Sequence, residues 1–388
     1  MSSLFAKKKQ ISLTAVFWAT LLLNTGAAFM WPLTTIYMNK MLHKSLTTAG
    51  TTLLVMSLMM MVGNYVGGIL FDCWSPYLAG LVGAGMSLIA MILLIFFHSW
   101  PIFGILLVVV GFGDGISLTI DNSFAATITH HKTRQVFNVL YIALNVGVVI
   151  GTLLVGYLLA LGITVIFTVT TVCYIVLFII MATAFRVDVD AMKPAKKEAN
   201  HVAPHRMQLI LLMCLMVFAI YASYALWESV ISVHMTNLGI PFRNYSLLWT
   251  LNGFMIVIGQ PFVNRLFVNL KLPVQIGIGV FIFATSFFLL VFTSQYYMFI
   301  IVMVVLTIGE MIGFPGMPAW IDALAVNGRK GKYQGMYNVA ISMGRAVGPL
   351  FGGIMIDEFS YQALFLTATI AIVVALFLLM GRYLQVGR

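Results

Sequence analysis

LTIGEMIGFPGMPAWID, residues 306–322, places one carboxylate, Glu310, in the middle of an apolar run that is long enough to cross a lipid bilayer. Moving a charged side chain to the bilayer centre costs about 2.5–3.5 kcal/mol on insertion scales, so an acid at that depth is expected to have a function. Residues that loosen a helix or let a neighbouring helix approach closely surround it: Gly309, Gly313, Pro315, Gly316 and Pro318. The stretch therefore indicates a membrane protein that uses an ionisable group.

The composition of the whole chain indicates the same class. Of its 388 residues, 61% are hydrophobic and 8% are charged, whereas a soluble domain has about 25% charged residues. The net charge of +10 would suit a soluble nucleic-acid-binding protein. Here the basic residues fall in short connections between apolar runs, so no nucleic-acid partner is expected. The three cysteines lie on or beside separate apolar runs and offer no metal-ligand spacing, so neither a metal nor a cofactor is expected.

Apolar runs of about 20 residues or more, the length that crosses a hydrocarbon core about 30 Å thick, occur twelve times. They cover approximately residues 11–38, 48–71, 77–97, 101–129, 135–160, 162–185, 208–236, 244–268, 273–293, 296–324, 333–357 and 362–381. The sequence therefore predicts an all-α membrane protein with twelve transmembrane helices, surrounded by the lipid bilayer and expected to be a monomer.

Lys and Arg are distributed unequally between the connections. With the N-terminus inside, the outer connections hold only Lys40, Lys44 and Arg243. This asymmetry predicts a multi-pass protein of the cell membrane with both termini in the cytoplasm. The longest polar stretch, residues 186–206, predicts a cytoplasmic linker between an N-terminal six-helix bundle (1–185) and a C-terminal one (207–388).

An internal repeat relates the two halves. GFGD, residues 111–114, occupies the same place in span four as TIGE, residues 307–310, in span ten. Gly147, Gly151 and Gly156 in span five recur 197 positions later in span eleven. Two six-helix bundles related by a parallel repeat describe the architecture of major facilitator transporters, which bind substrate near the midplane.

Two motifs carry a more specific resemblance. GRAVGPLFGG, residues 344–353, resembles the GxxxGPxxGG signature of drug/proton antiporters of the major facilitator superfamily, and GGILFD, residues 67–72, resembles the start of the superfamily's loop motif. Residues 35–42, 141–151 and 307–315 are most similar to the LmrP-like multidrug/proton antiporters. The resemblance implies a gating or conformational role for Gly68, Asp72, Gly344, Gly348, Pro349, Gly352 and Gly353. For the glycines of span eleven, close helix packing alone is an equal alternative.

Three acids are candidates for proton coupling or substrate binding. A carboxyl inside the membrane can exchange a proton as its surroundings change, which favours Glu310 as a coupling group over a purely structural acid. Asp114 has a similar depth, but the glycines around it also suit close packing of helices. Glu228, in the outer half of span seven, could contact a cationic substrate or a proton; equal alternatives are that it snorkels to the interface or faces an outer vestibule.

Three further charged residues are candidates for a gate. Asp121 and Asp322 approach the cytoplasmic ends of spans four and ten, where a gate or loop contact is expected. Arg345 lies about three turns inside span eleven, where an unpaired guanidinium would be costly. Asp322 is a plausible partner for it, either in a cytoplasmic gate or in a static structural pair.

Aromatic residues lie on spans that line the cavity in this architecture, and their ring faces suit lipophilic cations. The candidates are Phe29, Trp31, Tyr221, Tyr224, Trp227, Trp249 and Phe314. Anchoring at the membrane interface is the alternative for each Trp and Tyr.

Together these features predict a proton-coupled exporter of hydrophobic, cationic compounds that works by alternating access. A proton-linked carrier of a metabolite such as a sugar or peptide is an alternative, as is a lipid-translocating or sensor protein on the same fold. The sequence has no GxxxxGK[ST], no HExxH and no nucleophile elbow, so neither ATP-driven transport nor an enzyme is expected.

Overall fold

The computed structural model describes residues 11–128, 130, 133–187, 203–267, 269–325 and 330–386, and these residues form helices and no strand. Within this part of the chain, twelve helical stretches are long and apolar enough to cross a membrane. The predicted all-α fold with twelve spans is confirmed. Helices suit this setting because each backbone N–H and C=O is satisfied within its own segment, where no water reaches.

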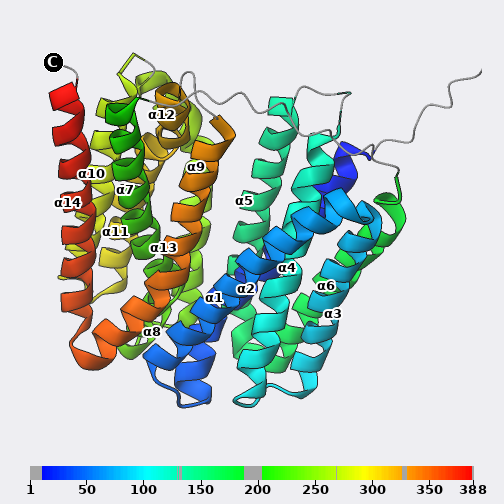
Figure 1. The fold of residues 1–388 in the computed structure, drawn as a ribbon. Helices are drawn as coiled ribbons and strands as arrows, with labels where there is room; N and C mark the ends of the chain where they lie inside the picture. The colour runs from blue at the N-terminus through cyan, green and yellow to red at the C-terminus, as the bar shows by residue number, and fades with distance from the viewer. Residues whose placement is uncertain are drawn as a thin grey trace, which may run out of the picture. The chain divides into compact units, whose positions relative to one another are not determined.

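The helices of the first six spans and the short turns joined to them are drawn from blue to green in Figure 1. Their bounds are α1 Leu13–Ile36, η1 Tyr37–Met41, α2 Leu46–Cys73, α3 Pro76–Phe96, α4 Ile102–Ala126, α5 Thr133–Leu158, η2 Leu159–Leu161 and α6 Ile163–Ala184. The helices of the last six spans are α7 Pro204–Glu228, α8 Val230–Asn237, α9 Phe242–Phe267, α10 Leu272–Leu290, α11 Tyr296–Gly313, α12 Gly316–Leu324, α13 Lys330–Glu358 and α14 Tyr361–Val386.

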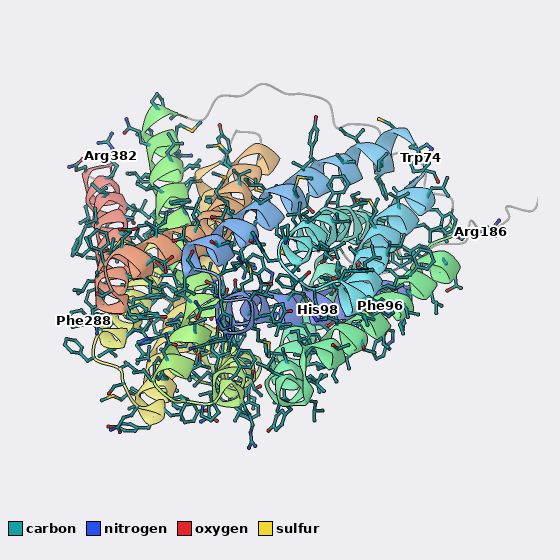
Figure 2. The ribbon with its side chains drawn as sticks, turned by 90° about the horizontal axis from the view of Figure 1, so that it is seen from below. Trp74, Phe96, His98, Arg186, Phe288 and Arg382 are labelled. Carbon is teal, nitrogen blue, oxygen red and sulfur yellow. The ribbon has the colours of Figure 1, made fainter. Side chains whose placement is uncertain are left out.

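Large apolar side chains cover the outer faces of these helices. Figure 2 labels two of them, Phe96 and Phe288, whose surfaces are 69% and 44% exposed. Such exposure would be unfavourable in water but matches a surface that faces lipid acyl chains.

Contacts divide the chain into two compact units, Met1–Trp31 with Val55–Pro194 and Pro32–Leu54 with Ala195–Arg388. In the first unit α3 packs against α4 and α6, and in the second α13 packs against α7 while α10 packs against α11 and α14. The stretch 32–54 thus belongs with the second unit, although the predicted bundles divide at residues 185 and 207. Most of the predicted linker, residues 188–202, lies outside the described residues.

The internal repeat extends to the packing inside each unit. A Cβ atom at Gly147 of α5 would lie 2.6 Å from the carbonyl oxygen of Leu21 on α1, and a Cβ atom at Gly344 of α13 would lie 2.6 Å from that of Phe218 on α7. Gly344 and Phe218 lie 197 positions after Gly147 and Leu21, respectively. The glycines therefore allow the same backbone-to-backbone approach in each unit.

A second pair of contacts repeats around the two acidic motifs. A Cβ atom at Gly113 would lie 2.7 Å from the carbonyl oxygen of Gly83, and one at Gly309 would lie 2.8 Å from that of Gly279, 196 positions later in each case. The residues that follow the two glycines are Asp114 and Glu310, which are thus equivalent in the two units.

Spans seven and ten differ from the prediction because each is interrupted. α7 ends at Glu228, and Ser229, with φ −118° and ψ −75°, separates it from α8. α11 ends at Gly313 and α12 begins at Gly316. Pro315 explains the second break, since it has no N–H to donate to the carbonyl group of Met311.

Candidate functional site

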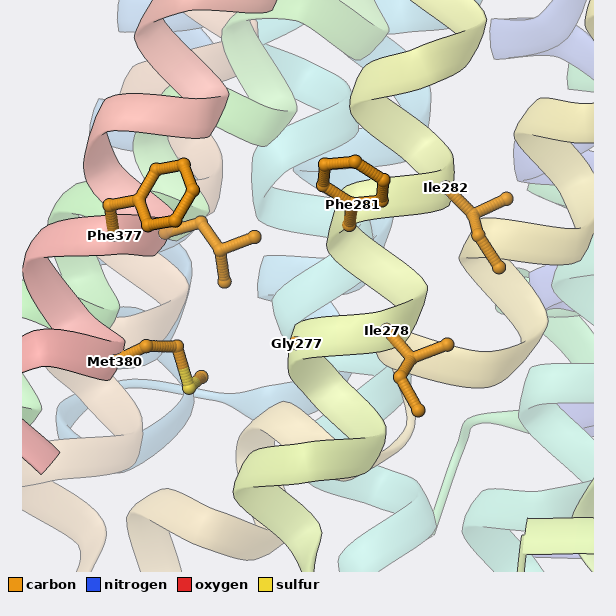
Figure 3. Close-up of a pocket in the computed structure, with 7 residues that line it drawn as sticks. Gly277, Ile278, Phe281, Ile282, Phe377 and Met380 are labelled. Atoms are coloured by element: carbon orange, nitrogen blue, oxygen red, sulfur yellow. The ribbon is translucent and has the colours of Figure 1, made fainter. Parts of the chain in front are cut away.

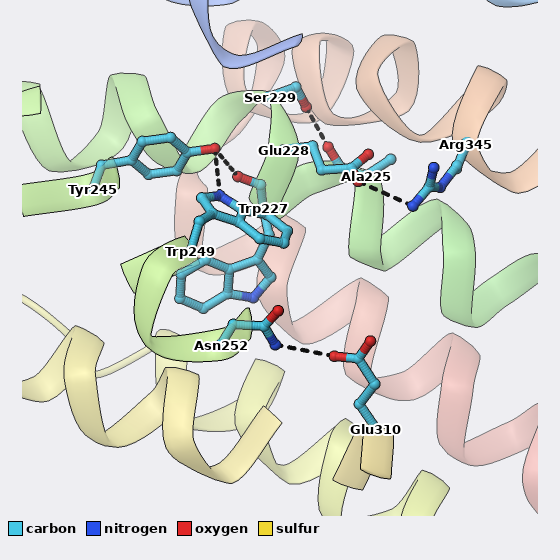
Figure 4. Close-up of polar contacts among 9 residues, drawn as sticks. All are labelled: Ala225, Trp227, Glu228, Ser229, Tyr245, Trp249, Asn252, Glu310 and Arg345. Carbon is cyan, nitrogen blue, oxygen red and sulfur yellow. Dashed lines mark hydrogen bonds and ion pairs between the residues drawn. The ribbon is translucent and has the colours of Figure 1, made fainter. Parts of the chain in front are cut away.

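Glu310 lies in the last turn of α11, just before the break in span ten. One of its carboxylate oxygens, Oε2, accepts a hydrogen bond of 3.1 Å from the amide Nδ2 of Asn252 on α9 (Figure 4). The same amide donates to the hydroxyl of Thr307 at 3.0 Å, and that hydroxyl donates to the carbonyl oxygen of Met303 at 2.7 Å. Asn252 therefore fixes the position of the carboxylate while leaving Glu310 only half-buried.

Glu228, the last residue of α7, forms an ion pair with Arg345 of α13. The Oε1 atom of Glu228 and the Nη2 atom of Arg345 are 3.1 Å apart, and the two side chains are 16% and 40% exposed. Oε2 of Glu228 and Nε of Arg345 are buried and have no hydrogen-bond partner among the described residues. Asp322, the partner suggested by the sequence, has a side chain outside the described residues.

Arg345 also lies against two aromatic rings. Its guanidinium carbon is 5.7 Å from the ring centre of Tyr221 and 5.9 Å from that of Tyr224, within the range of cation–π attraction. Arg345 and Glu310 interact electrostatically as well. We call the set of residues brought together here the Arg345 site: Tyr221, Tyr224, Glu228, Asn252, Glu310 and Arg345.

Aromatic side chains form one wall of the Arg345 site. The ring of Tyr224 lies 5.7 Å from Trp249, 6.4 Å from Phe314 and 6.3 Å from Phe283, on which it stacks. The structure thus brings together four of the aromatic residues proposed from the sequence, Tyr221, Tyr224, Trp249 and Phe314, and adds Phe283.

Two glutamine side chains satisfy the carbonyl groups at the break in span ten. Gln260 of α9 donates to the carbonyl oxygen of Met311 at 3.0 Å, and Gln275 of α10 donates to that of Ile312 at 2.9 Å. Met311 is the residue whose usual donor is replaced by Pro315. The break next to Glu310 is therefore held from two neighbouring helices, as interruptions inside a membrane must be.

Side chains also satisfy the backbone at the break in span seven. The hydroxyl of Tyr245 donates to the carbonyl oxygen of Trp227 at 2.7 Å, and it accepts a hydrogen bond of 2.8 Å from the indole Nε1 of Trp249. The hydroxyl of Ser229 donates to the carbonyl oxygen of Ala225 at 2.6 Å. These contacts fix the end of α7, and with it Glu228.

Asp114, the equivalent of Glu310 in the first unit, has a different environment. Its side chain is 3% exposed, and its two oxygens accept hydrogen bonds from the hydroxyls of Ser87, at 2.7 Å, and Tyr174, at 2.8 Å. The position of the second unit that matches Ser87 holds Phe283, which has no donor for Glu310. The enclosed carboxylate of Asp114 is thus suited to holding α3, α4 and α6 together.

The remaining candidates do not join the Arg345 site within the described part of the chain. Asp121 of α4 is fully buried, and both its oxygens lack a hydrogen-bond partner among the described residues. The side chain of Asp72 lies outside the described residues. Phe29 and Trp31 belong to the first unit, and the side chain of Trp227 is fully buried.

The four candidate glycines of α13, Gly344, Gly348, Gly352 and Gly353, are contact positions. Gly348 lies against the backbone of Ala222 and Gly352 against the side chain of Leu226, both on α7. Gly353 lies against the backbone of Leu46, and the carbonyl group of Pro349 lies against Gly50, both on the part of α2 that belongs to the second unit. Gly68 of α2 has more space, because a Cβ atom there would lie 3.9 Å from the side chain of Thr119.

Sequence reasoning missed the amides that position the acid and its helix break. Asn252 and Gln260 lie eight residues apart in span eight, and Gln275 lies in span nine. Uncharged polar side chains within apolar runs are the signal that could have identified them, because such groups bond to neighbouring helices.

A groove between α10 and α14 contains none of these polar groups. It has a volume of about 340 Å³ (Figure 3). Its lining is entirely apolar in residue type: Gly277, Ile278, Phe281, Ile282, Leu376, Phe377 and Met380. Across the described residues, no cluster of three His, Cys, Asp or Glu side chains could hold a metal ion.

Comparison with known proteins relates this chain to a wider group. The family described as "Major Facilitator Superfamily" matches residues 16–268 and 212–386. The uncharacterized MFS-type transporter YttB of Bacillus subtilis is 36% identical over 368 residues, which cover 91% of this chain and 90% of YttB. A second B. subtilis protein, the uncharacterized MFS-type transporter YqjV, is 30% identical over 60% of this chain and 58% of its own length.

Solved structures share the fold at low identity. A peptide transporter POT in complex with sulfate superposes with a TM-score of 0.83 at 12% identity and covers 100% of this chain and 96% of its own. A variant of the nucleoside transporter NupG gives a TM-score of 0.77 at 11% identity, over 96% of this chain and 99% of its own. These likenesses concern the fold alone.

Proposed function

The chain belongs to the major facilitator superfamily and is therefore a multi-pass membrane transporter, and we propose that it exports hydrophobic cations in exchange for protons by alternating access. This function is that of the drug/proton antiporters, and in particular of the LmrP-like proteins that its motifs resemble. The observation that carries the proposal is the composition of the Arg345 site, in which two carboxylates, one of them paired with a guanidinium, lie beside a wall of aromatic rings.

The balance of charge in the Arg345 site supports a cationic substrate. Glu228 is paired with Arg345, whereas Glu310 accepts a hydrogen bond from the neutral amide of Asn252 and faces Glu228, Tyr224 and Arg345 from the neighbouring helices. With Glu310 ionised the site has one surplus negative charge, and with Glu310 protonated it has none. A cation and a proton therefore compete for the same site, which is the coupling that exchange requires.

The aromatic wall supports a lipophilic substrate. Tyr221 and Phe314 are half-buried, so their rings present apolar surface next to the two carboxylates. Ring faces attract organic cations that have poorly hydrated charges.

The proposal is tested by efflux from proteoliposomes that carry an imposed pH gradient. We expect export of tetraphenylphosphonium or ethidium to follow the gradient, and Glu310→Gln to abolish that dependence. Glu358→Gln, at the exposed end of α13, is the matched control and should transport normally. Export that ignores both the gradient and Glu310→Gln would reject proton coupling.

We also propose that the protein lies in the cell membrane as a monomer with both termini in the cytoplasm, because Lys and Arg concentrate in the connections on that side. Proteolysis of a terminal tag in intact cells and in inverted vesicles tests the orientation. Cleavage in intact cells would place the tag outside and contradict it.

A proton-linked carrier of small peptides or other metabolites is the second candidate. The observation in its favour is the 40% exposure of Arg345, whose guanidinium could bind a carboxylate of the substrate. Uptake of labelled dipeptides into the same proteoliposomes distinguishes the two functions.

A further inference from the structure

The Arg345 site contains a cation that belongs to the protein itself. Arg345 contacts Glu228 at 3.1 Å, lies over the rings of Tyr221 and Tyr224, and interacts electrostatically with Glu310. It therefore occupies the kind of environment that an organic cation would seek, with a carboxylate on one side and aromatic faces on the other. We propose that Arg345 limits the substrate to a single positive charge. This inference rests on the proposed function, cation export.

Four ionisable side chains interact with Arg345: Glu228, Glu310 and the two tyrosines, Tyr221 and Tyr224. With both carboxylates ionised and the tyrosines neutral, the site has a net charge of −1, because the guanidinium remains protonated under all relevant conditions. One positive charge on a substrate compensates this surplus, whereas two positive charges would leave a buried excess.

An uncompensated charge inside the membrane is strongly unfavourable, so the charge balance selects between substrates of similar shape. Selection of this kind works by rejecting the wrong ligand as well as by binding the right one. A monocation gains the attraction of Glu310, but a dication also meets the repulsion of Arg345. The aromatic wall attracts both and therefore does not distinguish them.

Arg345 is also held in a way that permits it to respond to a ligand. Among the described residues, Arg345 forms a close ion pair with one carboxylate, that of Glu228, and its Nε is buried without a hydrogen-bond partner. At the same time 40% of its side-chain surface is accessible. Part of the Arg345 side chain is thus accessible to a ligand.

The test measures binding of a monocation and a dication to the purified full-length protein in detergent. Tetraphenylphosphonium and a bis(triphenylphosphonium) with a short linker serve as probes, since both carry phenyl rings on each charged phosphorus, in the unmutated protein and in four variants. Arg345→Gln gives a site charge of −2, Glu228→Gln gives 0, and the double variant returns to −1. Arg345→Lys keeps the charge but not the guanidinium.

We expect the unmutated protein and Arg345→Lys to bind the monocation at least tenfold more tightly than the dication. Arg345→Gln should reverse this preference, and the double variant should restore it. Glu228→Gln should weaken binding of both probes at least tenfold. A preference for the monocation that is unchanged in Arg345→Gln, with normal monocation binding, would overturn the inference while leaving cation export intact.

Arg345→Gln leaves Glu228 without its partner and could prevent folding. In that event the inference is tested by comparing Glu228→Gln with the double variant. Replacing Arg345 in the Glu228→Gln protein should increase the affinity for the monocation tenfold or more. No recovery in a double variant that elutes as a folded protein would also overturn the inference. If the unmutated protein binds neither probe, the proposed cation export fails together with the inference about Arg345. The outcomes described above, in which the monocation is bound, overturn the inference alone.

Discussion

Thr47 donates two hydrogen bonds to a single oxygen of Asp357, one from its backbone N–H at 2.8 Å and one from its hydroxyl at 2.6 Å. Thr47 lies in the first turn of α2, and Asp357 lies one residue before the end of α13. Close packing of Gly353 against Leu46 and of Gly50 against Pro349 continues the contact along the two helices. Residues 310 positions apart in the chain are thus joined at one end of the second unit.

The first prediction is that this contact must open during transport. Thr47→Cys with Asp357→Cys, on a background in which Cys73, Cys173 and Cys214 are replaced by Ser, should cross-link on oxidation and lose transport, which reductant should restore. Pairing Thr47→Cys with Glu358→Cys is the control, because the next residue on a helix points about 100° away. Undiminished transport by the cross-linked protein would show that the contact is static.

The second prediction concerns the break in span ten. Gln260→Leu removes the donor to the carbonyl group of Met311 and should lower the free energy of unfolding by about 1–3 kcal/mol, the usual effect of a buried carbonyl left unsatisfied. Pro315→Ala supplies a backbone N–H that can donate to the same carbonyl, so it should reduce the effect of Gln260→Leu. A double-mutant cycle of unfolding in detergent measures this coupling. Strict additivity of the two changes would contradict it.

Gln275 provides the matched comparison for this cycle. Its amide donates to the carbonyl group of Ile312, whose usual donor, the N–H of Gly316, is still present in the chain. Gln275→Leu should therefore destabilise the protein, but Pro315→Ala should not rescue it.

The third prediction separates the two equivalent acids. Asp114→Asn replaces one of two acceptor oxygens by an NH₂ group that faces a hydroxyl donor, so we expect a loss of about 1–3 kcal/mol in unfolding free energy. The pH dependence of export should persist in Asp114→Asn and be absent in Glu310→Gln. Loss of pH dependence in both variants would assign the two acids the same role.

The fourth prediction concerns the glycines. Gly348→Ala would place a Cβ atom against the backbone of Ala222, which cannot yield without separating α13 from α7. Such overpacking destabilises by about 1–3 kcal/mol. Gly68→Ala, whose Cβ would lie 3.9 Å from Thr119, is the control, with an expected change within about 0.5 kcal/mol. Thermal unfolding followed by size-exclusion chromatography compares the two variants.

Much of the fold was predictable because length and hydropathy determine where a helix can cross a bilayer. The predicted spans 77–97 and 162–185 correspond to Pro76–Phe96 and Ile163–Ala184 in the structure. The offset between the glycines was also predictable, and it recurs in the contacts that these glycines make. Both features depend on positions within a single helix or on spacing along the chain.

The composition of the site was only partly predictable. Glu228 and Arg345 were both candidates, but they are 117 positions apart, and the direction in which Arg345 points depends on how α13 packs against α7. The break at Ser229 could not be foreseen, because span seven has no proline at this point. The hydroxyl that satisfies the backbone there belongs to Tyr245, which lies on a different helix.

Ser87 and Phe283 occupy equivalent positions beside the two acids, and they are one of the differences between the repeats at this depth. Asp114 accepts hydrogen bonds from two hydroxyls, those of Ser87 and Tyr174, whereas Glu310 accepts one from the amide of Asn252. The symmetry of the chain thus extends to the backbone contacts around the acids but not to the side chains that bond them, so the two halves are alike in shape and unlike in chemistry.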